Sequence, residues 1–302
     1  MRPPVTPRRA NPVAVAVAAV SVACLLGGCG GSPTEAVTPS RVEVAVVDTG
    51  VTPVHAVRDH LVPGVSCTPG CAPDTPSDGD GHGTAVAALL VTGGAPTGLP
   101  PGPAIVPVRV ADERGTLSIG GVAAGIGWAA ERAVPVVALP LVLGGASPAV
   151  AEAIRNTPDT LFVVPAGNDG LDVDDRSVPV HPCVDPAPNI LCVTAGHPDG
   201  RLSDASNRGR ISVDLAAPGV DLPAVDPNGR TVRVSGSSYA VPLAARAAAT
   251  LLSEQPGSNA AALADALRCG RRTAGTGDRT VGGVLDLGRA RTALHTGRCP
   301  TD

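Results

Sequence analysis

The chain has 302 residues, of which 43% are hydrophobic and 17% charged, and its formal net charge is −4. This composition disfavours a disordered chain, and the negative balance gives no basic surface for nucleic acid, so we expect no nucleic-acid partner. The length suits one large domain or two small ones. Aromatic residues make up only 1%, so the core must be filled by Ala, Val, Leu and Ile.

The first 28 residues have the pattern of an export signal. Three arginines within the first nine residues precede an apolar stretch over residues 13–26 that ends at small residues. This stretch is short for a membrane-spanning helix, which needs about 20 apolar residues. We expect residues 1–28 to be a lipoprotein-type signal peptide and residues 29–40 a short linker.

The segment Leu26-Gly27-Gly28-Cys29 resembles a bacterial lipobox. In a lipobox the cysteine is lipidated and becomes the mature N-terminus, so Cys29 is the candidate lipid site and the membrane a candidate partner. Ordinary cleavage nearby, or an uncleaved anchor, are the alternatives. The protein is then expected at the outer face of the bacterial cell membrane or outside the cell. Only residues 30–40 separate Cys29 from the predicted domain, so we expect no folding prodomain.

Six of the eight cysteines lie beyond the signal and lipid site. An even number in an oxidising compartment predicts disulfides, and six cysteines allow 15 pairings. Pairing of neighbours is favoured because each bond then closes a short segment, whereas a zinc site is disfavoured because no CxxC pair occurs. The favoured pairs are Cys67–Cys71, Cys183–Cys192 and Cys269–Cys299.

From residue 42 onward, short Val/Ile/Leu-rich runs alternate with Ala-rich stretches. Several runs are apolar on both faces, which is typical of a parallel sheet covered by helices. The predicted strands are Val42–Val47, Ala104–Val110, Val134–Val142, Thr160–Val164, Ile190–Thr194, Ile211–Leu215 and Thr231–Val234. The predicted helices are His82–Val91, Ile119–Arg132, Pro148–Asn156, Ser238–Leu252, Ala260–Arg268 and one near Leu287–Leu294.

This alternation indicates βαβ units with right-handed crossovers. It therefore predicts an α/β fold over residues 41–302, with a doubly wound, mostly parallel sheet and helices on both faces. The Pro/Gly-rich stretches Cys67–Gly81 and Gly93–Pro103 are predicted to be surface loops.

Four polar residues occupy one edge of the predicted sheet. Asp48 and Asn168 follow strands, and His82 and Ser238 open helices. The carboxyl ends of parallel strands and the amino ends of the helices share an edge, which is where open α/β sheets place their sites. Taken singly, each residue has a commoner role as a turn residue, a helix cap or an ordinary histidine. Together they indicate a site.

The four residue types suit acyl transfer. A serine hydroxyl needs a base to take its proton, and His82 is the candidate base for Ser238. Asp48 would hold the other ring nitrogen of His82, and the start of its helix should help to keep the ring neutral. The N–H of Ser238 and the side chain of Asn168 would stabilise an oxyanion.

Four segments in this order resemble those of the subtilases, the subtilisin-like serine proteases. They are DTG at Asp48, DGHGT around His82, PAGN ending at Asn168 and GSSYAVP around Ser238. The resemblance extends over about residues 41–294. It implies a serine endopeptidase that acts on protein or peptide substrates, with Asp48, His82 and Ser238 as catalytic triad and Asn168 in the oxyanion hole.

The sequence departs from the family pattern at two places. Ser237 stands where the family has Thr before the nucleophile, and Tyr239 stands where it has Met. The segment nearest to the family's substrate-lining strand spans residues 138–145, and its Pro140 removes a backbone donor. The resemblance points to four substrate-binding residues, Leu143, Gly144, Ala166 and Gly167.

We expect no cofactor, although structural calcium, common in subtilases, stays open. Residues 78–83 resemble the start of an EF-hand loop, but His82 stands where Asp or Asn is needed and Leu89 where Glu is needed. The acidic residues Asp172, Asp174 and Asp175 fit a solvated loop better than a metal site. The signal, the cysteines and the short linker are also similar to the mycosins, subtilases of type VII secretion. The alternative function is therefore a scaffold with a secretion-complex partner.

Overall fold

The computed structural model describes residues 41–68, 70–74, 77–94, 102–175, 177–197, 199–272 and 282–301. The predicted signal peptide, the linker and Cys29 lie outside the described residues, as does most of the predicted loop Gly93–Pro103. Residues 40–302 form one compact unit. Within the described ranges, no helix combines the length and apolar character that crossing a bilayer requires.

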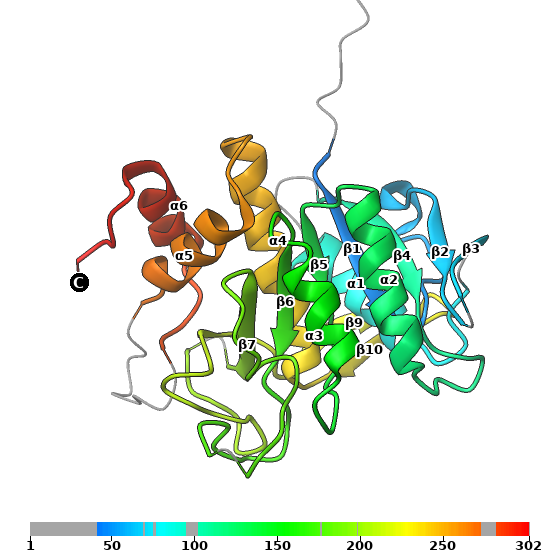
Figure 1. Cartoon of the computed structure of the whole chain (residues 1–302), viewed down its shortest axis with the longest axis horizontal. Helices are drawn as coiled ribbons and strands as arrows, with labels where there is room; N and C mark the ends of the chain where they lie inside the picture. Colours follow the sequence, from blue (N-terminus) through cyan, green and yellow to red (C-terminus); the bar gives the residue numbers. More distant parts are fainter. Residues whose placement is uncertain are drawn as a thin grey trace, which may run out of the picture. The chain divides into compact units, whose positions relative to one another are not determined.

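The described strands form one eight-stranded sheet in the order β3-β2-β4-β1-β5-β6-β7-β8, and a separate hairpin of β9 and β10 (Figure 1). All neighbours in the large sheet are parallel except β2 and β3. The strands are β1 Glu43–Asp48, β2 Gly64–Ser66, β3 Ala72–Asp74, β4 Ala104–Arg109, β5 Val136–Ala138, β6 Leu161–Pro165, β7 Ile190–Gly196, β8 Leu215–Pro218, β9 Leu222–Val225 and β10 Thr231–Val234.

Helices cover both faces of the sheet, which confirms the predicted α/β fold class. Alternate residues of a strand point to opposite faces: Val44 and Val46 pack with α1, α4 and α5, whereas Ala45 and Val47 pack with α2 and α3. The helices are α1 His82–Thr92, α2 Ile119–Glu131, α3 Pro148–Arg155, α4 Ser237–Glu254, α5 Ala260–Gly270 and α6 Leu287–Thr296, with a short 3-10 helix at Arg58–His60.

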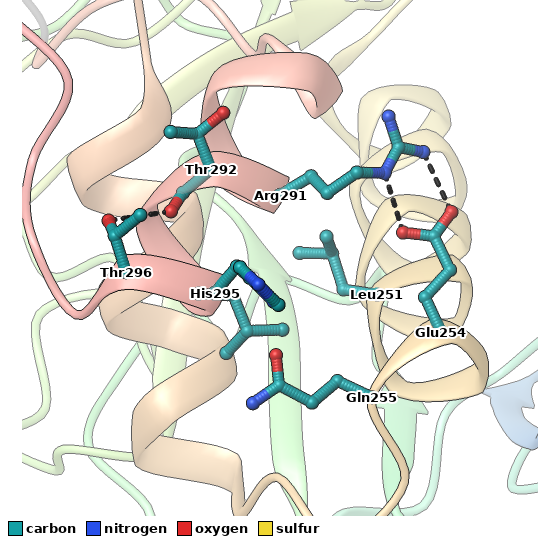
Figure 2. Close-up of a pocket in the computed structure, with 8 residues that line it drawn as sticks. Leu251, Glu254, Gln255, Arg291, Thr292, His295 and Thr296 are labelled. Carbon is teal, nitrogen blue, oxygen red and sulfur yellow. Dashed lines mark hydrogen bonds and ion pairs between the residues drawn. The ribbon is translucent and has the colours of Figure 1, made fainter.

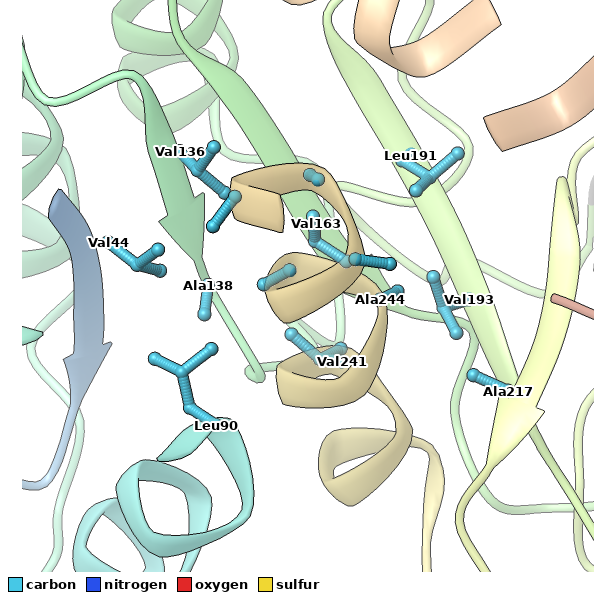
Figure 3. Close-up of a cluster of buried hydrophobic side chains, with 14 of the residues drawn as sticks. Val44, Leu90, Val136, Ala138, Val163, Leu191, Val193, Ala217, Val241 and Ala244 are labelled. Carbon is cyan, nitrogen blue, oxygen red and sulfur yellow. The ribbon is translucent and has the colours of Figure 1, made fainter. Parts of the chain in front are cut away.

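Helix α4 runs across the middle of one sheet face. Its Val241 and Ala244 lie against Val163 and Val193 of the central strands, and all four side chains are buried (Figure 3). Small alanines let the helix backbone approach the sheet closely, while each buried valine contributes about 1.5–3 kcal/mol relative to an exposed one. The position of α4, and so of its first residues, is therefore fixed by the core.

Two predicted strands differ from the observed ones. The strand predicted over Ile211–Leu215 begins only at its last residue, Leu215, where β8 starts. Ile211 is 87% exposed, and Asp174 accepts hydrogen bonds from the N–H groups of Ile211 and Ser212, at 3.0 and 2.9 Å, which holds a turn there. The strand predicted to reach Val142 ends at Ala138. Pro140 follows, and its missing N–H cannot extend a sheet ladder.

Three short strands were not predicted. β2 and β3 form an edge hairpin of three residues each, and β3 lies within the predicted loop Cys67–Gly81. Strand β9 pairs with β10 through residues Leu222–Val225. These runs are too short for their alternation to be recognised.

The structure has three disulfides among the described residues: Cys67–Cys71, Cys183–Cys192 and Cys269–Cys299. They join the pairs favoured on sequence grounds. The first and second close short loops, and the third ties α5 to the segment after α6.

Candidate active site

Asp48 ends β1 at the point where the order of the sheet reverses. Strand β1 lies between β4 and β5, so the chain builds one side of the sheet, crosses over β1 and then builds the other side. Crevices at such switch points are where open α/β sheets bind ligands. The side chain of Asp48 is fully buried, and its Oδ1 accepts a hydrogen bond of 2.7 Å from the N–H of Thr49.

His82, the first residue of α1, lies directly beside Asp48. Its Nδ1 is 2.9 Å from both carboxylate oxygens of Asp48. The side chain of His82 is 23% exposed. One ring nitrogen is thus held by a buried carboxylate, and the other is left for a reaction partner.

Asp78, which sequence reasoning did not select, fixes the start of α1. Its buried carboxylate accepts hydrogen bonds from the N–H groups of Gly81 and Thr84, at 2.7 and 2.8 Å. It also accepts from the hydroxyls of Thr84 and Thr49, at 2.6 and 2.9 Å. Asp78 therefore links the end of β1 to the first turn of α1. The sequence signal for Asp78 lay in the motif around His82, which was compared only with a metal-binding loop.

The pKa of His82 is raised above its ordinary value. Burial alone lowers it, but the carboxylate of Asp48 raises it through its charge and its hydrogen bond, and Asp80 and Asp78 add to the effect. From its place at a helix start, the sequence predicts a ring that is helped to stay neutral. The net pKa shift is nevertheless upward, because the nearby negative charges outweigh the burial of the ring.

Ser238 and Asn168 come together around Gly236. A Cβ on Gly236 would lie 3.4 Å from Nδ2 of Asn168 and 3.6 Å from Oγ of Ser238. A Cβ would fit at these distances, but the φ angle of Gly236 is +148°, which L-residues rarely adopt, so the backbone angle favours glycine here. Oδ1 of Asn168 accepts a 2.7 Å hydrogen bond from the N–H of Ser237, which leaves Nδ2 as the available donor.

Two side chains hold the loop that follows β6, residues 166–169, in place. The hydroxyl of Ser237 accepts a hydrogen bond from the N–H of Gly167 at 3.1 Å, so the serine in place of the family's threonine keeps a structural contact. Asn207 donates to the carbonyl of Ala166 and accepts from the N–H of Asp169, at 2.8 and 2.9 Å. Asn207 lies in the segment after β7 and was not among the residues predicted for the site.

One cavity of about 320 Å³ brings the four candidate residues together. It is lined by Asp48, His82, Asn168 and Ser238, and on the other side by residues 140–142. The four residues predicted to bind substrate do not line it. The side chain of Leu143 is buried and its backbone pairs with His181, Gly144 is exposed, and Ala166 and Gly167 are buried. Pro140, Leu141 and Val142 take that place instead.

A second cavity, of about 570 Å³, lies on the hairpin side of His82. It is bordered by His82, by Tyr239 and by the β9–β10 hairpin with its turn at Asp226–Arg230. The rings of His82 and Tyr239 have centroids 5.2 Å apart and planes tilted by 46°. Sequence reasoning recorded Tyr239 only as a departure from the family pattern.

A third cavity, of about 350 Å³, lies between the end of α4 and α6 (Figure 2). It contains an ion pair in which Arg291 donates to Glu254 at 2.6 and 2.7 Å, above the apolar side chain of Leu251. None of the four candidate residues lines it. Among the described residues there is also no group of three His, Cys, Asp or Glu side chains arranged to hold a metal ion.

The parallel sheet and the residues at its carboxyl edge define a subtilisin-like α/β architecture. The chain belongs to the subtilase family, whose model matches residues 40–282. It superposes on the protease domain of PatA with a TM-score of 0.68 and 26% identity, covering 86% of this chain and 97% of that one. A cold-adapted subtilisin-like serine proteinase matches with the same score and identity, over 86% and 89%.

Curated relatives agree with this placement. The cell wall-associated protease of Bacillus subtilis is 32% identical over 59% of this chain and 20% of its own length. The cuticle-degrading serine protease of Orbilia oligospora is 31% identical over 76% of this chain and 54% of its own length. The chain thus spans from a fifth to about half of the length of these relatives.

Proposed function

We propose that this chain is an exported serine endopeptidase with Asp48, His82 and Ser238 as its catalytic triad. The observation that carries the proposal is the contact of 2.9 Å between Nδ1 of His82 and the buried carboxylate of Asp48, on a cavity that also contains Ser238 and Asn168. The family and the relatives named as proteases support the same activity.

Acylation begins when Oγ of Ser238 attacks the carbonyl carbon of a peptide bond. Nε2 of His82 accepts the hydroxyl proton, and Asp48 stabilises the imidazolium that forms. The carbonyl oxygen becomes an oxyanion, which the Ser238 N–H and Nδ2 of Asn168 stabilise. In subtilisin the loss of such an asparagine donor costs roughly 2.7–4 kcal/mol. The C–N bond then breaks as His82 gives its proton to the departing amine.

Deacylation repeats these roles with water as the nucleophile. His82 takes a proton from water, the hydroxide attacks the acyl carbon, and Ser238 leaves after recovering its proton from His82. Apart from the substrate and water, all groups in both steps come from this chain, so we propose a reaction without a cofactor. The substrate class is protein or peptide.

A fluorophosphonate probe tests the activity directly. We expect stoichiometric labelling of the purified protein and its loss in Ser238→Ala, because only a hydroxyl activated by a base reacts with the probe. Circular dichroism shows whether both proteins are folded. A folded wild-type protein that is not labelled by the probe would contradict the proposed activity.

We also propose export and anchoring through a lipid on Cys29, on the strength of the lipobox-like segment. One acyl chain gives only marginal membrane binding, so a diacylated cysteine is the expected form. Mass spectrometry of the mature N-terminus is the test, and an unmodified terminus downstream of Cys29 would exclude the anchor.

The scaffold alternative predicts a different result. If the protein served mainly as a scaffold, Ser238→Ala would retain full function and the same secretion-complex partners in a pull-down. The assembled Asp48–His82 pair favours catalysis, because a pure scaffold has no need of a buried carboxylate held against a histidine.

A further inference from the structure

Tyr239, the residue after the proposed nucleophile, packs against the proposed base. It is the single tyrosine of the chain. Its ring centroid is 5.2 Å from that of His82, and the two planes are tilted by 46°. Aromatic rings at this separation and tilt attract each other beyond the effect of the area they bury.

The ring of Tyr239 has a firm support behind it. It packs against a small core cluster that includes Leu222 of β9 and Leu243 of α4. Its backbone N–H donates to the carbonyl of Gly236 at 3.1 Å. The position of the ring is thus set by this cluster and by the first turn of α4, and the ring can transmit that position to His82.

His82 needs such a contact because its imidazole is held at one end only. Nδ1 is fixed by Asp48, but a ring held at one atom can still swing about it. Cavities border His82 on two sides, one containing Ser238 and the other facing the hairpin. Without a contact on its hairpin side, the imidazole has room to swing away from the serine.

We propose that Tyr239 is a positioning residue, whose ring holds the imidazole of His82 in place and directs Nε2 toward Ser238. The inference rests on the proposed function of the triad. It assigns the role to the ring and not to the hydroxyl. A displacement of about 1 Å of a reacting group can cost about a hundredfold in rate, so a restraint on this swing has measurable consequences.

Several charged groups surround the pair. Asp48, Asp78 and Asp80 raise the pKa of His82. Across the hairpin cavity lie Asp226 and Arg230, which form an ion pair at 2.7 Å. Burial raises the pKa of Tyr239, and Asp48 and Asp80 raise it further, so the phenol is neutral at working pH. The burial of His82 lowers its pKa, and the Tyr239 ring contributes to that burial.

Two substitutions separate the ring from the hydroxyl. Tyr239→Phe keeps the ring, and we expect its kcat, KM and pH profile to stay within about twofold of wild type. Tyr239→Leu removes the ring, and we expect kcat to fall about tenfold with KM within about twofold, because the base is misplaced while the substrate still binds. The acid limb of kcat/KM should also move to higher pH, since a better hydrated His82 has a higher pKa.

Val234→Ala is the matched control, because it removes apolar packing from the same cluster without the ring contact. We expect it to keep the wild-type pH profile. A Tyr239→Leu protein with wild-type kcat and pH profile would overturn the inference, as would a Tyr239→Phe protein as impaired as Tyr239→Leu.

Nuclear magnetic resonance of the Ser238→Ala protein gives a readout that needs no activity. The imidazole signals of His82, assigned by their loss in His82→Gln, should shift on Tyr239→Leu through loss of the ring current and should stay in Tyr239→Phe. Unchanged His82 signals in Tyr239→Leu would contradict the contact. This result is independent of whether the protein hydrolyses peptides, so failure of the proposed function and failure of this inference are distinguishable.

Discussion

The helices α1 and α4 both begin at the candidate site, but their first N–H groups are treated differently. Both follow a glycine with a positive φ, Gly81 and Gly236, and neither has a side-chain cap from that residue. The other four described α-helices are capped by a side chain, from Ser118, Ser147, Asn259 and Asp286.

At the start of α1 each early N–H group has an acceptor. The N–H of His82 donates to Asp80, that of Gly83 to the hydroxyl of Thr49, and that of Thr84 to Asp78. At the start of α4 the N–H of Ser238 has no acceptor among the described residues. The start of α1 is thus closed, with its early N–H groups paired around the proposed base, whereas the start of α4 is open and keeps an N–H group for the proposed oxyanion.

The largest expected effect comes from removing Ser238, the proposed nucleophile at the open start of α4. We expect Ser238→Ala to lower kcat by roughly 10⁶-fold, the loss known for the equivalent change in subtilisin. The double variant Ser238→Ala/His82→Ala should be no slower than Ser238→Ala, because a base without its nucleophile contributes nothing. Steady-state hydrolysis of a peptide library gives both values.

Glu254→Gln is the control for that experiment, since it alters the other end of α4, at the cavity of Figure 2. Its kcat should equal that of wild type. An active Ser238→Ala protein, or a further loss in the double variant, would show that Ser238 and His82 do not act as one unit.

Asn168→Asp tests whether the side-chain amide beside the open start of α4 donates to the oxyanion. Aspartate keeps the oxygen that accepts from the N–H of Ser237 but replaces the amide donor with a charged oxygen. We therefore expect kcat to fall by about 10²–10³-fold, with little change in thermal stability. Asn168→Ala should show the same loss of kcat and an additional stability loss of about 1 kcal/mol. Equal kcat values in Asn168→Asp and wild type would show that Asn168 does not donate to the oxyanion.

The sheet and the four candidate residues were predictable because their signals are local. Val44–Val47 is a continuous apolar run that ends at a charged residue, and a buried parallel strand has just this pattern. The Ala-rich helices keep their pattern over at least eight residues, so their predicted ends differ from the observed ones by only a few residues. The position of Asp48 and His82 on one edge follows from strand and helix direction alone.

Other features depend on tertiary contacts that leave little local signal. Ile211 begins a run in which apolar and polar residues alternate as in a strand, but a carboxylate 37 residues earlier in the chain, that of Asp174, holds it in a turn. The contact of Tyr239 with His82 joins two helices far apart in sequence. The cavity wall contains Pro140 and not the predicted Leu143, and which of the two lines it depends on where β5 ends. None of these can be read from periodicity or composition.

Breaking the closed start of α1 should destabilise the protein. Asp78→Asn puts an amide where buried N–H and O–H groups need an acceptor. Because each buried donor left unpaired costs about 1–3 kcal/mol, we expect a loss of about 3 kcal/mol. Urea unfolding in the Ser238→Ala background, which prevents self-digestion, measures it. Asn259→Ala at the start of α5 removes an ordinary cap and should cost only about 1 kcal/mol. Equal losses in the two variants would contradict the special role of Asp78.

The smallest effect concerns the charge of Asp80. This carboxylate raises the pKa of His82 and accepts from its backbone N–H at 3.1 Å, and Asp80→Asn keeps an oxygen for that bond while it removes the charge. The pKa of His82 should fall, so the neutral base persists to lower pH and the acid limb of kcat/KM moves to lower pH. Activity at high pH should stay unchanged.

The lower pKa of His82 in Asp80→Asn also affects stability. At low pH the variant should gain activity but lose stability. A pKa raised in the folded state adds stability that is fully present below the unfolded value of about 6.5 and is lost as pH rises through the folded value. Asp80→Asn should therefore lose stability at pH 5 and not at pH 9. Because Asp80 is exposed, high salt should shrink the difference in the acid limb between variant and wild type. Asp199→Asn, an exposed carboxylate on the turn after β7, is the matched control and should leave the limb in place. A limb that moves equally in both variants would show that general surface charge, and not the neighbour of His82, sets its pKa.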